Sequence, residues 1–83
     1  MNFNAFKSGL LEELRDFYGK DANVYIVQGF PNKTGKRDGI CIQFTDDDTA
    51  PVISLNELYQ YYTDGNLDMV DCVGWIIDRR EKL

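Results

Sequence analysis

The side chains that most often carry out chemistry are scarce in this chain. It contains no histidine, which removes the usual base of a catalytic triad, the imidazole ligands of zinc and the charge switch near neutral pH. Cys41 falls within a predicted strand and Cys72 on the apolar side of a predicted helix. Neither lies at a helix N-terminus, where a thiolate would be stabilised. We therefore expect two buried, reduced thiols and no enzymatic activity.

Two segments superficially resemble ligand sites. Residues 29–37 contain two glycines followed by cations, but the glycine spacing is one residue too long for a phosphate-binding loop, and Arg37 replaces the magnesium-binding hydroxyl. Asp46, Asp47 and Asp48 carry oxygen ligands for a hard cation, yet the central glycine and distal glutamate of a calcium loop are missing. Aspartate is also common in turns. We expect no catalytic residue, no metal and no cofactor.

Charge is distributed unevenly along the sequence. The chain has a net charge of −5, with nine basic residues in all. From Asp38 to Asp78 there are nine acidic residues and no lysine or arginine. An even distribution would place roughly four or five cations in that window. The acidic half favours a partner with a basic surface and disfavours direct binding to nucleic acid.

Helical periodicity places two aromatic residues among these acids. In the last predicted helix, Trp75 lies outside the apolar arc, about 60° beyond Cys72. In the preceding helix, Tyr61 projects opposite the predicted core residues. An aromatic ring among like charges on an exposed helix face is typical of a binding hot spot. Trp75 has the alternative role of covering the edge of the core. The candidate protein-binding residues are Glu57, Tyr61, Asp64, Asp68, Asp71, Trp75 and Asp78.

The leading hypothesis is a non-enzymatic module whose acidic, aromatic-bearing helical face docks on a basic protein surface. Its sharper form is an inhibitor that mimics nucleic acid in the groove of a nucleic-acid-binding protein, such as a phage or mobile-element counter-defence protein. Reversing the charges of Asp68, Asp71 and Asp78 is expected to abolish binding and to leave thermal stability largely intact. Two alternatives remain: RNA binding through Lys33, Lys36 and Arg37, and a dimerisation domain with Trp75 buried across a symmetric interface.

The elements that must position these residues can be read from periodicity and caps. A helix is expected over residues 4–18, capped by Asn2 or Asn4 and stopped at Gly19. Strands are expected over residues 24–30, 39–45 and 51–53, with a polar loop over residues 31–38. A capping box over residues 54–57 opens a second helix that ends at Gly65, and Asn66 caps a third over residues 67–82. The apolar side of the first helix comprises Phe3, Phe6, Leu10, Leu11, Leu14, Phe17 and Tyr18; the apolar arc of the third comprises Met69, Val70, Cys72, Val73, Ile76 and Ile77.

This order predicts a single α+β domain with a three-stranded antiparallel sheet and helices packed on one face. No apolar run approaches the length of a membrane span, and residues 1–6 lack the pattern of a signal peptide, so we expect a cytoplasmic protein without membrane partners. The oligomeric state is expected to be a monomer or a homodimer.

The chain resembles a family of short domains without established activity from gut-type Gram-positive bacteria and their mobile elements. The resemblance rests on residues 2–6, 52–59 and 62–65, of which the strand leading into a Leu/Tyr helix is the most specific. It implies a cytoplasmic bacterial or mobile-element origin, and no catalytic residue can be carried over from the family. The element order is also similar to that of double-stranded-RNA-binding domains. Those domains need a lysine cluster at the helix after the sheet, where this chain has residues 54–57, including Glu57.

Overall fold

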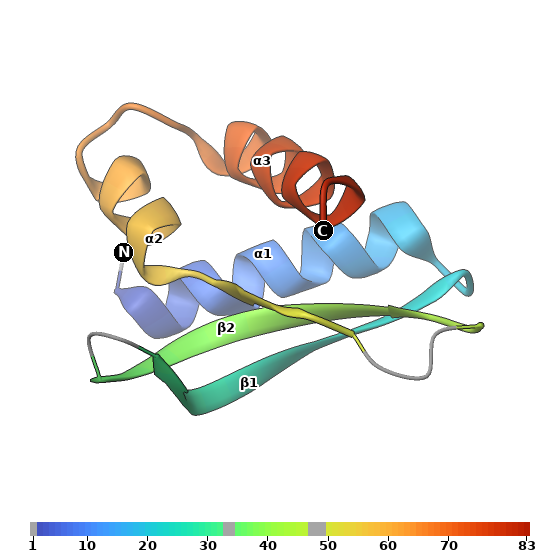
Figure 1. The fold of residues 1–83 in the computed structure, drawn as a ribbon. Helices are drawn as coiled ribbons and strands as arrows, with labels where there is room; N and C mark the ends of the chain where they lie inside the picture. Colours follow the sequence, from blue (N-terminus) through green and yellow to red (C-terminus); the bar gives the residue numbers. More distant parts are fainter. Residues whose placement is uncertain (1, 33–34, 47–49) are drawn as a thin grey trace.

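Helices cover one face of a three-stranded antiparallel sheet in the described part of the chain (Figure 1). The computed structural model describes residues 2–32, 35–46 and 50–83. The order α-β-β-β-α-α in one compact domain confirms the predicted α+β class. The elements are α1 (Phe3–Tyr18), β1 (Ala22–Asn32), β2 (Gly35–Phe44), β3 (Val52–Ser54), α2 (Asn56–Thr63) and α3 (Met69–Glu81).

The first helix begins and ends where its local signals predict. The Asn2 side chain accepts a hydrogen bond from the Ala5 amide at 2.8 Å, and Gly19 ends α1 with a φ of 57°. This is the left-handed region that glycine enters without a steric penalty. The apolar side reaches the core through fully buried residues in successive turns. Phe17 is the exception, because its ring packs edge-on against Tyr18 and stays 62% exposed.

The β1–β2 hairpin is longer than its side chains predict. Residues 31–38 were expected to form a loop, but Pro31 pairs with Lys36 and Asn32 with Gly35. The prediction was wrong because ladder hydrogen bonds join backbone groups and form with polar side chains as well as with apolar ones. The register shifts between Val27 and Phe30, which marks a bulge.

The alternation in β2 has the predicted consequence. Ile40 and Ile42 are fully buried beneath the helices. Cys41 points to the opposite face of the sheet, and it is nevertheless only 2% exposed. Both cysteines are free and buried, as expected.

Pro51 directly precedes β3 and limits the strand at its N-terminal end. Arg80 supplies the hydrogen bond that the β2–β3 ladder lacks at this point. Extending the β2–β3 register by one residue places Pro51 opposite Ile42. Proline has no N–H to donate. The Nε of Arg80 donates instead to the Ile42 carbonyl at 3.0 Å, and the guanidinium lies over the Phe44 ring at 4.9 Å. This side-chain hydrogen bond takes the place of the backbone bond that Pro51 cannot donate, and it joins the C-terminal end of α3 to β2.

The starts of the two C-terminal helices differ from the prediction. Ser54 belongs to β3, so it does not cap α2, whose N-cap is Leu55 without a side-chain bond. The capping box lies one element later. Asp68 accepts from the Asp71 amide at 2.8 Å, and the Asp71 carboxylate accepts from the Asp68 amide at 3.3 Å. Asn66 therefore does not cap α3. Among the described residues, no helix is long and apolar enough to span a bilayer.

Candidate functional site

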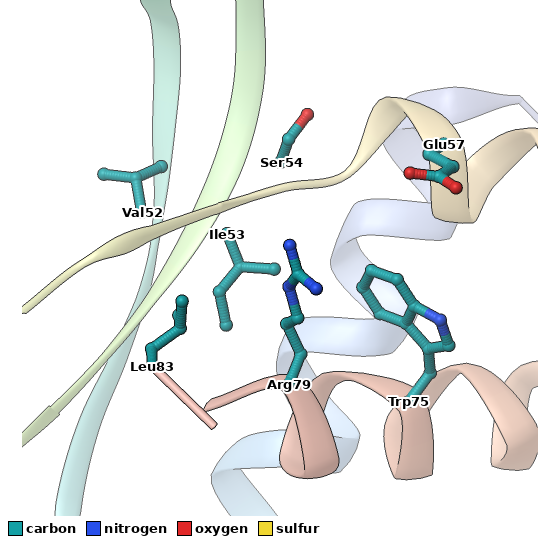
Figure 2. A pocket seen from close by; sticks show the side chains of 7 residues that line it. All are labelled: Val52, Ile53, Ser54, Glu57, Trp75, Arg79 and Leu83. Atoms are coloured by element: carbon teal, nitrogen blue, oxygen red, sulfur yellow. The ribbon is translucent and has the colours of Figure 1, made fainter. Parts of the chain in front are cut away.

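An open groove lies where the edge of the sheet meets the two C-terminal helices. It has a volume of about 240 Å³. Figure 2 shows Trp75 and Arg79 rising from α3 toward β3, with Glu57 on α2 at the far side. Residues of β3, α2 and α3 thus converge on one surface. The lining residues are Val52, Ile53, Ser54, Glu57, Trp75, Arg79 and Leu83.

Trp75 is half-buried, packing against the core and lining the groove. The fully buried Cys72 and Ile76 mark the centre of the buried stripe of α3. At about 100° per residue, Trp75 lies about 80° from that centre and Val70 about 140°. The centre of the apolar arc predicted from the sequence lies about 60° from the centre of the observed buried stripe. The two differ because the prediction gave every apolar residue of the helix equal weight. Val70, predicted to be in the core, is therefore 78% exposed.

Tyr61 is also only partly exposed, and its hydroxyl donates to Glu57 Oε1 at 2.7 Å. The two side chains lie one helical turn apart on α2. The hydrogen bond to Glu57 and its negative charge raise the pKa of Tyr61 above its ordinary value. Tyr61 therefore orients the Glu57 carboxylate at the groove, and it is not among the residues that line the groove.

The remaining predicted acids are exposed, and each has a partner within its own helix or turn. Asp64 accepts from Gln60 Nε2 at 3.2 Å, and Asp78 pairs with Lys82 at 2.9 Å. Asp68 and Asp71 form the capping box of α3 described above. The prediction that reversing Asp68, Asp71 and Asp78 leaves thermal stability largely intact did not include this capping box, so we now expect the reversal to lower stability as well. A lysine at the cap would place a positive charge at the positive end of the helix dipole.

One acid of the cation-free window belongs to a different part of the fold. The Asp38 carboxylate forms an ion pair with the largely buried Lys7 of α1. It also accepts from the Gly29 amide, at 3.1 Å. The hydrogen bonds from Lys7 and from Gly29 lower the pKa of Asp38. Asp38 therefore holds α1 to the bulge of β1.

Arg79 is the charged groove residue that was not predicted from the sequence. It directly follows the cation-free window, yet it lies one turn after Trp75 and on the same side of α3. The spacing of four residues was the available signal. The groove therefore combines a positive and a negative side chain, Arg79 and Glu57, on either side of an indole ring.

The alternative nucleic-acid residues are not gathered in a loop as expected. Lys36 and Arg37 belong to β2, in the paired part of the hairpin, and Lys33 lies outside the described residues. RNA binding through this segment stays a prediction. Asp47 and Asp48 of the acidic turn also lie outside the described residues.

Both thiols are buried, and Cys72 lies near two carboxylates. Burial, together with the charges of Asp68 and Asp71, raises the pKa of Cys72, which favours the unreactive thiol. Within residues 2–32, 35–46 and 50–83, no three histidine, cysteine or acidic side chains are close enough together to hold a metal ion. No family model, curated protein or solved structure matches the chain.

Proposed function

We propose that this protein is a non-enzymatic binding module that docks a basic protein surface in the groove between β3, α2 and α3. The observation that carries the proposal is the position of Trp75, which lines an open groove next to the Glu57 carboxylate. Tryptophan is enriched among residues that dominate binding energy, because it buries a large area in a rigid geometry. A half-buried ring is already ordered, so binding costs little side-chain entropy.

The charge around the groove supports a basic partner. Four exposed acids lie on or at the ends of α2 and α3, the helices that line the groove together with β3: Glu57, Asp64, Asp71 and Asp78. A complementary basic surface would accelerate association and make it sensitive to salt. The narrower hypothesis is that the partner is a nucleic-acid-binding protein and that these acids stand in for phosphates. A bacterial mobile-element context is consistent with the family resemblance and is proposed on that ground alone.

The test is an affinity capture from a lysate of the source cell, followed by protein identification. We expect a basic protein to be retained by the wild type and lost with Trp75→Ala. The matched control is Phe17→Ala, which removes an aromatic ring that is 62% exposed on α1, away from the groove. Equal retention by the wild type and both variants would contradict the proposal.

Charge is tested separately from the ring. Replacing Glu57, Asp64 and Asp78 by lysine changes three exposed acids at α2 and α3, of which Glu57 lines the groove, and spares the capping box of α3. Its control replaces Glu12, Glu13 and Asp16, which are exposed acids of α1, and changes the net charge equally. We expect the first variant alone to lose the captured protein. If both variants lose it, net charge is responsible, and the groove is not the binding site.

A further inference from the structure

The outer edge of β3 presents backbone groups that point away from the sheet. The Leu55 amide donates to the Asp38 carbonyl at 3.1 Å, so these two residues form a hydrogen-bonded pair. Bonded and non-bonded pairs alternate along an antiparallel ladder. Ile53 therefore bonds to Ile40 within the sheet, whereas the N–H and C=O groups of Val52 and Ser54 point outward. Among the described strands, β3 has β2 as its only neighbour, so this edge is open to an added strand.

The other edge of the sheet is protected by its own side chains. The Val24 carbonyl, which points outward from β1 by the same alternation, accepts from Arg15 Nε at 3.0 Å. Further along β1, the bulge at Gly29 interrupts the regular edge. Bulges and capped edges are common devices that prevent unwanted strand pairing. No equivalent interaction with Val52 or Ser54 occurs among the described residues.

The open edge forms one wall of the groove described above. Val52 and Ser54 line it from β3, and Trp75 and Arg79 line it from α3 (Figure 2). A strand added at this edge would place alternate side chains against the indole ring, because side chains of a strand alternate between its two faces. Backbone bonds would then supply affinity, and the groove would supply specificity.

We propose that the groove takes an extended segment of the partner protein, which adds to β3 as a fourth strand. The segment carries an apolar side chain against Trp75 and a lysine or arginine toward Glu57. This inference rests on the proposed function and names its binding mode. The basic residue follows from the Glu57 carboxylate, which Tyr61 holds at the groove, and from the exposed acids of α2 and α3.

The probe is the peptide acetyl-Thr-Lys-Thr-Val-Thr-Lys-Thr-amide, in which the valine and both lysines share one face of the strand, titrated into ¹⁵N-labelled protein. We expect the amide resonances of Val52 and Ser54 to shift and their hydrogen exchange to slow. Two further peptides carry backbone N-methyl groups, either on the two lysines and the valine or on the two internal threonines. Since alternate N–H groups of a strand face opposite sides, one of these peptides should bind like the parent. The other should bind at least about tenfold more weakly, because it has lost its edge donors.

Charge gives a second, independent comparison. Glu57→Lys is expected to weaken binding of the parent peptide, and Arg79→Glu to strengthen it. An acidic peptide with glutamate in place of each lysine should respond in the opposite direction to both variants. The unfolding midpoint of each variant, compared with that of the wild type, shows whether the groove is still folded.

Several results would overturn strand addition. If both N-methylated peptides bind equally, or if resonance shifts are confined to α2 and α3, the partner docks by side chains, and the proposed function survives without this mode. If Val52 and Ser54 are protected without peptide and in proportion to protein concentration, the occupant is a second copy of the chain. If the parent peptide leaves these amides unchanged at millimolar concentration, the edge does not accept an extended segment. The capture experiment then decides the proposed function by itself.

Discussion

Replacing Asp38 with asparagine should destabilise the protein far more than its position in a polar segment indicates. The carboxylate pairs with Lys7, and the two side chains are 22% and 9% exposed. Removing one partner of a fully buried pair costs about 3–5 kcal/mol, because the other charge stays buried without compensation. Partial hydration of Asp38 reduces this to about 2–3 kcal/mol. Asparagine keeps an oxygen that can accept from the Gly29 amide, so the variant isolates the loss of charge.

The assay is reversible thermal unfolding at pH 7, followed by circular dichroism. For a domain of this size, the expected loss lowers the unfolding midpoint by roughly 10–20 °C. Asp21→Asn, at an exposed position between α1 and β1, should change the free energy of unfolding by less than about 0.5 kcal/mol. In a Lys7→Met background, Asp38→Asn should cost less than about 1 kcal/mol, because no buried cation remains. If Asp38→Asn alone is as stable as the control Asp21→Asn, the pair with Lys7 does not stabilise the fold as argued.

The pH dependence provides a further check on the same pair. The pKa of Asp38 is lowered in the folded state, so its contribution to stability is complete above the pKa of the unfolded chain, about 3.9. That contribution disappears as the pH falls through the folded-state value. The difference in stability between the wild type and Asp38→Asn should therefore be constant from pH 7 to about pH 5 and should shrink below about pH 4. An unchanged difference in acid would contradict an ionised Asp38.

Three further predictions concern the rest of the fold. Arg80→Ala should lower the free energy of unfolding, measured in urea, by about 1–3 kcal/mol, because the Ile42 carbonyl loses its hydrogen-bond donor. An unchanged stability would show that water replaces the arginine as donor. Asp68→Ala should lower the free energy of unfolding by about 1 kcal/mol, because α3 loses its N-cap, whereas Ser54→Ala should lower it by less than about 0.5 kcal/mol. A larger effect of Ser54→Ala would show that Ser54 caps α2. Cys72 should react with an aromatic disulfide reagent at pH 8 at least about tenfold more slowly in the folded protein than in urea, because burial raises its pKa; equal rates would show that it is accessible.

Local signals were sufficient for the parts of the fold that depend on neighbouring residues. The cap at Asn2 and the stop at Gly19 act within one turn of α1, so their residue types determine the boundaries. The alternation of β2 placed Ile40 and Ile42 in the core. The same reasoning failed at Ser54, which is the last residue of β3 and lies opposite Gly39 of β2. Its sequence fits a helix cap, but a strand contact distant in the sequence determines its role.

The sequence predicted two residues of the candidate site, but it did not predict how they are arranged. Trp75 and Glu57 were both chosen from charge and periodicity, and they line the same groove. Their proximity depends on the angle between α2 and α3, which no short segment encodes. Arg79 was missed because it was read as a charge that complements the helix dipole. Only its distance from β3 and Trp75 makes it part of the groove.

The amino-acid sequence by itself determined the element order, the α+β class, most of the core and the acidic character of the second half. These follow from periodicity, caps and composition, which act over a few residues. Tertiary structure decided which charges are buried in pairs, which helix face meets the core and which backbone groups stay open at β3. The pairing of Lys7 with Asp38 joins residues more than thirty positions apart. The face that α3 turns toward the core depends on its packing against the other layers of the domain. Their energies exist only after the chain has brought those groups together, because ion pairing and burial depend on distance and solvent exclusion.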